Sequence, residues 1–73
     1  MQTMNIEGVE YGVYRKANTQ PMRPYTPGES LEGVSVSKED TPGEGGMIAC
    51  NPSNPADKWY VAADFVRANY VPA

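Results

Sequence analysis

Short stretches of alternating apolar and polar residues predict β-strands in this chain. Val9–Lys16, "VEYGVYRK", is rich in β-branched and aromatic residues, which fit a pleated surface. Residues 32–37, "EGVSVS", alternate strictly, so that Val34 and Val36 face one way and the serines face the other. Both segments are therefore expected to be strands.

The C-terminal half predicts a hairpin followed by a helix. Met47–Cys50 is a continuous apolar run, typical of a central strand, and "KWYVA" at 58–62 forms the next strand after a loop with Asn-Pro steps. Apolar residues then recur at the spacing of one face of a short amphipathic helix: Ala62, Phe65, Val66 and Tyr70. Pro72 is expected to stop this helix.

Irregular segments that contain proline and glycine separate these elements. Residues 17–33 hold three prolines and a Pro-Gly step, and residues 38–45 hold a second Pro-Gly step, so both are expected to be loops. Residues 1–73 are expected to form a single small domain. Its expected class is α+β, with a three- to four-stranded antiparallel sheet, one short C-terminal helix and long irregular loops.

The aromatic residues of the last predicted strand face opposite sides of the sheet. Trp59 and Val61 point one way and Tyr60 points the other. Because a single helix buries one sheet face, we expect Trp59 in the core under Phe65 and Val66. Tyr60 is then expected on the open face, where an exposed aromatic surface could serve a partner or a second copy.

The composition argues against an enzyme. The chain has 73 residues, a net charge of -3 and no histidine, which is the commonest general base and metal ligand. Cys50 is the single cysteine, and in an apolar strand it is expected to behave as a small hydrophobe. We therefore expect no catalytic residue, no metal and no cofactor. The acidic balance also argues against direct nucleic-acid binding, which depends on many Lys and Arg contacts with phosphates.

The location and assembly follow from the same bulk properties. The first residues lack a basic segment followed by an apolar run, and no window has the apolar length of a membrane span. We therefore expect a cytoplasmic protein with no membrane partner. So short a chain buries a modest core, and without disulfides or metal it is expected to gain support as a homo-oligomer.

Two groups of charged residues are candidate binding sites. Arg and Tyr are over-represented at interface hot spots, and Arg can clamp a phosphate or carboxylate at two points. They gather at one strand end and in the loop beyond it: Tyr14, Arg15, Lys16, Arg23 and Tyr25. The alternative is a strand end with ordinary solvated charges. The acidic group is Glu39, Asp40 and Glu44, in a turn-rich segment where the alternative is a solvated loop.

Several short motifs of this chain resemble those of a group of very small phage and prophage proteins. That group has an early Tyr-Arg-Lys strand, a Gly-bounded strand, a strand ending in Trp-Tyr-Val and a helix with Phe and a closing Tyr. The residues that carry the resemblance are Tyr14, Arg15, Lys16, Gly46, Ile48, Trp59, Tyr60, Val61, Phe65 and Tyr70. The chain departs from the pattern at Gly45-Gly46-Met47, where the group has a Pro-Gly-Asp turn, and in its long acidic segment. The resemblance implies a phage-encoded protein in the cytoplasm of an infected bacterium.

The main hypothesis is a non-enzymatic binding protein that inhibits a host protein of defence or nucleic-acid handling. Its acidic stretch, residues 29–44, would face a basic partner. The alternative is an oligomeric sponge for a nucleotide-like signalling molecule. In that case Arg15, Lys16 and Arg23 would meet phosphates, while Tyr14, Tyr25 or Tyr60 would stack on a base. A third hypothesis is a minor virion component.

Overall fold

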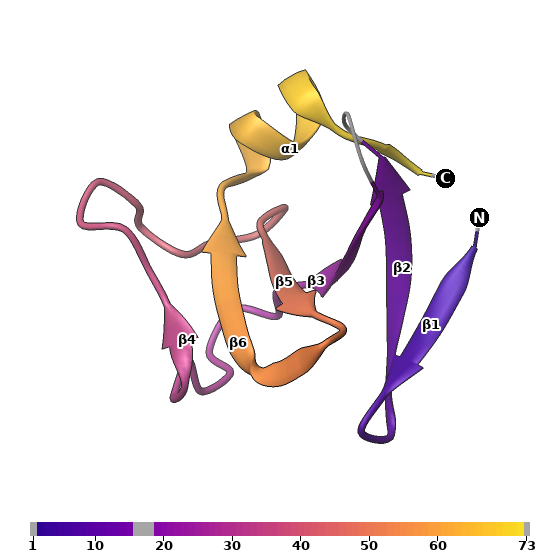
Figure 1. Ribbon diagram of the computed structural model, residues 1–73. Coiled ribbons are helices and arrows are strands. Elements are labelled where there is room, and N and C mark those ends of the chain that lie inside the picture. Colours follow the sequence, from indigo (N-terminus) through magenta and orange to yellow (C-terminus); the bar gives the residue numbers. More distant parts are fainter. Residues whose placement is uncertain (1, 16–18, 73) are drawn as a thin grey trace.

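β-Strands dominate the computed structural model, which describes residues 2–15 and 19–72. Seven strands form one sheet, and one short helix follows the sixth strand (Figure 1). The elements are β1 Thr3–Ile6, β2 Val9–Arg15, β3 Thr19–Pro24, β4 Val34–Ser35, β5 Met47–Asn51, β6 Asn54–Val61, α1 Ala63–Asn69 and β7 Val71–Pro72. The expected α+β class with a three- to four-stranded antiparallel sheet is therefore wrong.

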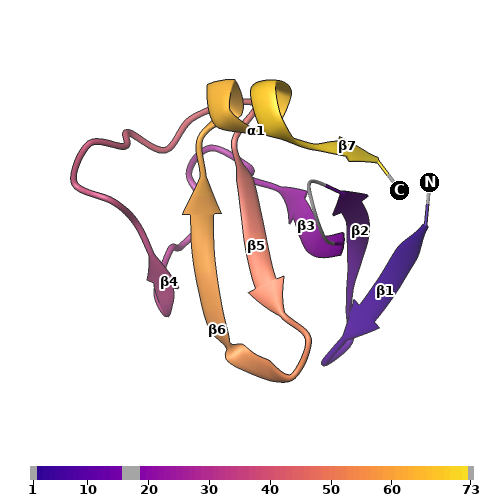
Figure 2. The same cartoon turned by 45° about the horizontal axis from the view of Figure 1, so that its top comes forward.

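The sheet is mixed, and α1 leads from β6 to β7, which pairs with β2. Its strand order is β1-β2-β3-β5-β6-β4, and β7 pairs with β2. All of these pairs are antiparallel except β4 with β6, which run parallel. In both ribbon views α1 lies across one end of the strands, between β6 and the short β7 beside β2 (Figure 2). No helix in the described ranges is long and apolar enough to cross a membrane.

The loop prediction for residues 17–33 is wrong at β3, because its prolines occupy special register positions. Pro21 pairs with β2 and lies before the first β3 residue that pairs with β5. Pro24 pairs with β5 and lies beyond the last residue that pairs with β2. Each proline therefore has a strand neighbour on one side only. A proline lacks the N–H that pairing on a second side would need, so it is tolerated at such positions. Met22, between them, pairs on both sides.

The N-terminal strand β1 was not predicted, although Thr3–Ile6 alternates polar and apolar residues over its four positions. It is held by a tight turn, in which Ile6 pairs with Val9 and the two residues between them have positive φ angles. Glu7 has φ 50° and Gly8 has φ 83°, as a two-residue hairpin turn requires. The Gly8 N–H also donates to Asn5 Oδ1 at 3.0 Å. Local turn geometry thus fixes a strand whose alternating pattern is too short to predict it alone.

Several predicted elements are confirmed with altered bounds. β2, the β5–β6 hairpin and α1 lie where the pattern predicts them. The strand expected over 32–37 is reduced to β4, and its parallel pairing with β6 could not be predicted. The helix ends at Asn69 with Tyr70 as its C-cap, and Val71 and Pro72 form β7.

Both faces of the sheet carry buried apolar residues. Ala49 and Cys50 are consecutive in β5, so they face opposite sides, and each belongs to a different cluster. The first cluster lies under α1 and contains Met22, Met47, Ala49 and Val61, with Tyr14, Trp59, Val66 and Tyr70 packed against it. The second cluster contains Ile6, Tyr11 and Cys50. A sheet covered on both faces has no open face of the kind expected for Tyr60.

The expected positions of Trp59 and Tyr60 therefore need correction. Tyr60 is buried, at 7% exposure, whereas Trp59 is only partly buried against the first cluster. The segment before β5 covers Tyr60, since the Gly43 N–H donates to the Tyr60 hydroxyl at 3.2 Å. Tyr25 also packs against it, with ring centroids 5.7 Å apart in an edge-to-face arrangement. The long irregular segment thus supplies a second cover that a single helix could not.

Candidate functional site

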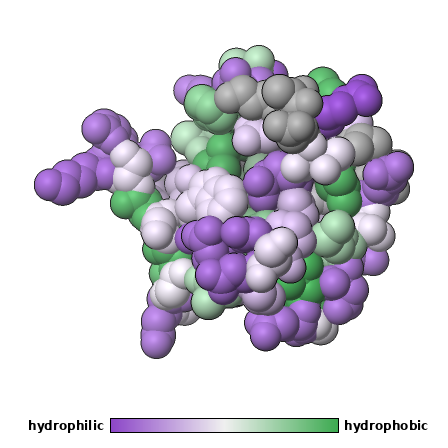
Figure 3. Space-filling model, viewed as in Figure 1, coloured by the Kyte–Doolittle hydropathy of each residue, from purple (hydrophilic) through white to green (hydrophobic). Residues whose placement is uncertain are grey.

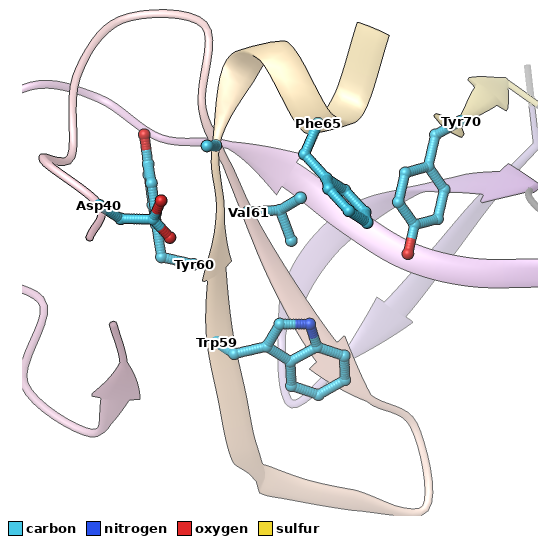
Figure 4. Close-up of a pocket in the computed structure, with 7 residues that line it drawn as sticks. Asp40, Trp59, Tyr60, Val61, Phe65 and Tyr70 are labelled. Carbon is cyan, nitrogen blue, oxygen red and sulfur yellow. The ribbon is translucent and has the colours of Figure 1, made fainter. Parts of the chain in front are cut away.

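A cavity of about 370 Å³ lies where the end of β6 meets α1 (Figure 4). β6 and the residue after it contribute Trp59, Tyr60, Val61 and Ala62, while α1 and its C-cap contribute Phe65 and Tyr70. Asp40 comes from the segment between β4 and β5. The size falls in the range of sites for small ligands or side chains, and the lining is mainly aromatic and apolar.

The aromatic side of the cavity is built from alternate residues of β6 and from residues of α1 and its C-cap. Trp59 and Val61 are two residues apart in a strand, so both point toward α1. Phe65 on α1 lies 46% exposed, and its ring centroid is 6.2 Å from that of Tyr70 at a tilt of 52°. Figure 4 shows Trp59, Val61, Phe65 and Tyr70 on one side of β6. Trp59, Phe65 and Tyr70 form the aromatic wall of the cavity.

The cavity continues past an edge of β6. Tyr60 and Asp40 lie on the other side of the strand from the aromatic wall (Figure 4). The pairing of β4 with β6 ends at Ser35 and Trp59. Beyond Trp59, β5 is the only described strand that pairs with β6. The lining includes both sides of β6, at the part of its edge that pairs with no described strand.

Asp40 is the charged residue in the lining of this cavity. Two described cations have partners elsewhere: Arg67 pairs with Asp64 on α1, and the Lys58 ammonium donates to the Pro55 carbonyl oxygen. The Asp40 side chain is half-buried, while its neighbour Glu39 is exposed. The hydroxyl of Ser37 donates to Glu39 and lowers the pKa of that carboxyl. Asp40 therefore gives the described lining of the cavity a negative charge.

The predicted Tyr-Arg-Lys cluster is divided by the fold. Tyr14 packs against the core cluster under α1, whereas Arg15 is exposed and pairs in register with Val71. Lys16 lies outside the described residues. Tyr25 lies against Tyr60, as described above. Arg15 does not form one surface with Arg23, which occupies the opposite end of β3 from Thr19, the residue paired with Arg15.

Arg23 has a partner within the chain. Its guanidinium donates to both oxygens of Glu29, with Nη2–Oε1 at 2.7 Å and Nη1–Oε2 at 3.1 Å. The side chains are 27% and 23% exposed, and the Tyr11 hydroxyl is a further partner of the guanidinium. Hydrogen bonds from Arg23, and then from the Thr26 N–H, hold the pKa of Glu29 below its ordinary value. Arg23 therefore stabilises a turn and is not available as a free phosphate clamp.

The predicted acidic group is also divided. Asp40 lines the cavity, while Glu39 and Glu44 are exposed on the same irregular segment. Space-filling Figure 3, in the same view as Figure 1, shows hydrophilic residues on the loop that projects beyond the sheet after β4. Gly45 brings the end of this segment to α1, since a Cβ there would lie 3.1 Å from that of Ala63. Asp40 is therefore the member of the acidic group that lines the cavity.

The comparisons do not assign a family to this site. No protein-family model, no curated protein and no solved structure matches the chain. The resemblance to small phage proteins therefore stays a prediction. Within residues 2–15 and 19–72, no group of three or more potential metal ligands lies close enough to hold an ion.

Sequence reasoning missed the aromatic wall because it assigned those residues to the core. Phe65 and Val66 are adjacent on α1, about 100° apart around the helix, so a narrow contact buries one more than the other. Val66 packs on the core and Phe65 is left at the rim. The seven-residue length of α1 was the available signal, since so short a helix covers little of the sheet.

Proposed function

We propose that this protein is a non-enzymatic binding protein that engages another protein through the cavity between β6 and α1. The observation that carries the proposal is the aromatic wall of Trp59, Phe65 and Tyr70, with Phe65 at 46% exposure. Aromatic residues dominate interface hot spots, and concave apolar sites with few polar groups are the usual binding sites of proteins. Nearby acidic residues favour a basic partner surface by charge complementarity.

The resemblance to phage proteins supports a more specific form of the proposal. In this form the protein is phage-encoded, acts in the cytoplasm of an infected bacterium and inhibits a host protein of defence or nucleic-acid handling. Glu39, Asp40 and Glu44 support it, since proteins that handle nucleic acids present basic surfaces. The inhibitor would then occupy such a surface and exclude its normal ligand.

The test compares two variants with matched exposure. Phe65→Ser removes the rim of the cavity, and Val9→Ser removes a side chain of similar exposure, 43%, from the β1–β2 hairpin. Proteins captured from bacterial lysate by the unmodified chain are identified, purified and titrated by calorimetry. We expect Phe65→Ser to weaken binding about tenfold or more and Val9→Ser to leave it unchanged. Equal binding by both variants, or capture no better than background, would overturn the proposal.

The nucleotide sponge remains the alternative prediction. Its two described cations, Arg15 and Arg23, do not form one phosphate site, because Arg23 is paired with Glu29 and is separated from Arg15. Asp40 in the cavity would also repel phosphate. Native mass spectrometry of gently purified protein tests both this alternative and the expected homo-oligomer. Extra mass released by denaturation would favour the sponge, and a bare monomer or dimer would favour the protein partner.

A further inference from the structure

We propose that two copies of this protein associate through the outer edge of β1, in an antiparallel register that places Met4 opposite Met4 of the second copy. This surface is separate from the proposed binding cavity, because β1 begins the strand order β1-β2-β3-β5-β6-β4 and the cavity lies at β6. Each copy therefore keeps its cavity free in the dimer. The proposal combines the open edge of β1, the side chains on that edge, and the way in which two such edges match.

The outer edge of β1 presents unpaired main-chain groups. β1 pairs with β2 and with no other described strand, and it is the outermost strand on its side of the sheet (Figure 1). On β2, the Val13 N–H donates to the Gln2 carbonyl oxygen at 2.8 Å. Because hydrogen-bonded and non-hydrogen-bonded pairs alternate in antiparallel strands, Met4, two residues further on, also bonds toward β2. The N–H and C=O groups of Thr3 and Asn5 therefore point outward.

The side chains of β1 do not protect this edge. Strand edges are commonly protected from other chains by charged side chains, proline or a bulge. β1 is Thr-Met-Asn-Ile, without charge or proline, and its pairing with β2 is regular over all four residues. At the opposite end of the strand order, β4 has only two residues. Met4 is 38% exposed, so the edge of β1 also carries an apolar side chain that a second copy would cover.

Two copies of β1 match when a two-fold axis passes beside Met4. Opposite residues of an antiparallel pair share one face, so Met4 meets Met4 of the second copy. Thr3 of each copy then lies opposite Asn5 of the other, and each such pair exchanges its outward main-chain hydrogen bonds. Apolar side chains thus face apolar ones and polar side chains face polar ones. This match favours a second copy over an unrelated peptide, and it gives a closed, symmetric dimer.

The acidic side chains next to the edge stay apart in this register. Within each copy Glu10 lies opposite Asn5, and Thr3 lies opposite Gly12. Across the dimer, the row of side chains that starts at Glu10 therefore ends at Gly12 of the second copy. Like charges placed directly opposite each other would destabilise the pairing, and this register avoids them. The dimer also enlarges the buried area of a chain that is small for a stable core.

Sedimentation equilibrium at protein concentrations up to the millimolar range measures the association. Met4→Lys places two like charges opposite each other, and Ser53→Lys adds the same charge at an exposed position of the β5–β6 turn. We expect Met4→Lys to raise the dissociation constant of the dimer about tenfold or more and Ser53→Lys to leave it unchanged. A monomer at every concentration, or equal effects of the two substitutions, would overturn the proposal.

Thr3→Pro tests the main-chain bonds without adding a charge. Proline removes the outward N–H of Thr3 and leaves the bonds between β1 and β2 in place, as it does on natural edge strands. This variant should also be monomeric, and the dispersion of its amide NMR signals establishes that it is folded. A folded Thr3→Pro variant that dimerises as tightly as the parent protein would contradict pairing at β1.

Disulfide formation tests the register. Met4→Cys places two thiols opposite each other in a non-hydrogen-bonded pair, whose Cα separation a disulfide can span. Asn5→Cys, also on the exposed edge, faces Thr3 of the second copy and is the control. Cys50 has no exposed surface and should not contribute. In oxidised glutathione we expect covalent dimers of Met4→Cys to form faster than those of Asn5→Cys. Equal rates, or faster dimer formation by Asn5→Cys, would exclude the proposed register.

Discussion

Gly46 lies so close to Tyr60 that a Cβ at Gly46 would be 2.1 Å from the Tyr60 hydroxyl oxygen. The same added atom would lie 2.5 Å from two ring carbons. Glycine is therefore required here for space. Because Tyr60 is buried and accepts a hydrogen bond from the Gly43 N–H, the contact fixes the irregular segment on the sheet.

Gly46→Ala should therefore lower the free energy of unfolding by about 1–3 kcal/mol, as overpacking does elsewhere. Urea denaturation measures the loss. Gly43→Ala is the matched control, since its Cβ would meet only the Thr41 carbonyl oxygen at 3.8 Å. Similar losses in both variants would show that backbone freedom, and not the contact with Tyr60, sets the cost.

The Arg23–Glu29 pair should make stability depend on acid. The pKa of Glu29 is lowered in the folded state, chiefly by Arg23, relative to an unfolded value of about 4.3. Its contribution is therefore complete above the unfolded pKa and is lost as the pH falls through the folded pKa. Glu29→Gln should cost about 1 kcal/mol at neutral pH and nothing at a pH below the folded pKa.

Urea midpoints measured from neutral to acidic pH would reveal this difference. Glu32→Gln, exposed on the same segment, loses the same charge and should change the profile little. A constant gap between the Glu29→Gln variant and the parent protein across the acidic range would contradict the proposed linkage.

The turn between β1 and β2 should be improvable by one substitution. Glu7 adopts φ 50°, a left-handed conformation that costs most residues about 1–2 kcal/mol and that asparagine tolerates better. Glu7→Asn should raise the free energy of unfolding by about 0.5–1 kcal/mol. Glu10→Gln, in the regular backbone of β2, is the control for the lost charge. If Glu7→Asn is no more stable than this control in thermal or chemical denaturation, the turn is not strained at Glu7.

Cys50 should be protected from thiol reagents in the folded protein. It has no exposed surface, and its Sγ lies 3.8 Å from the Asn51 and Pro55 carbonyl oxygens. Reaction then requires opening of the β5–β6 hairpin, so labelling should be slower than in urea by about 10³-fold or more. A native rate close to the rate in urea would mean that this hairpin opens freely.

The hydrophobic pattern predicted those elements whose own residues carry a clear period of apolar positions. β2, β5, β6 and α1 each contain enough apolar residues in the right period. β3 could not be predicted, because its prolines are acceptable only through the offset between its pairing with β2 and its pairing with β5. β4 is too short to be a strand without β6 beside it.

The candidate site was predictable in part. Asp40 and Tyr60 were both named from sequence, and both line the cavity, although Tyr60 was expected on an open face. Arg23 was predicted to bind a ligand. The sequence does not show that the turn from Thr26 to Glu29 brings the Glu29 carboxylate to the Arg23 guanidinium. The Glu29 N–H donates to the Thr26 carbonyl oxygen at 3.0 Å, and that single turn decides the partner of Arg23.

The pairing of β7 with β2 has a kinetic consequence. Tyr14 pairs with Pro72 and Arg15 pairs with Val71, near the other end of the sequence. Such a contact requires closure of a very long loop, and sheets built from distant pairings fold in milliseconds to seconds where local helical bundles need far less. Until that closure occurs, this edge of β2 is exposed to pairing with other chains. Refolding of this small protein should therefore be slower, and more sensitive to concentration, than its size alone would indicate.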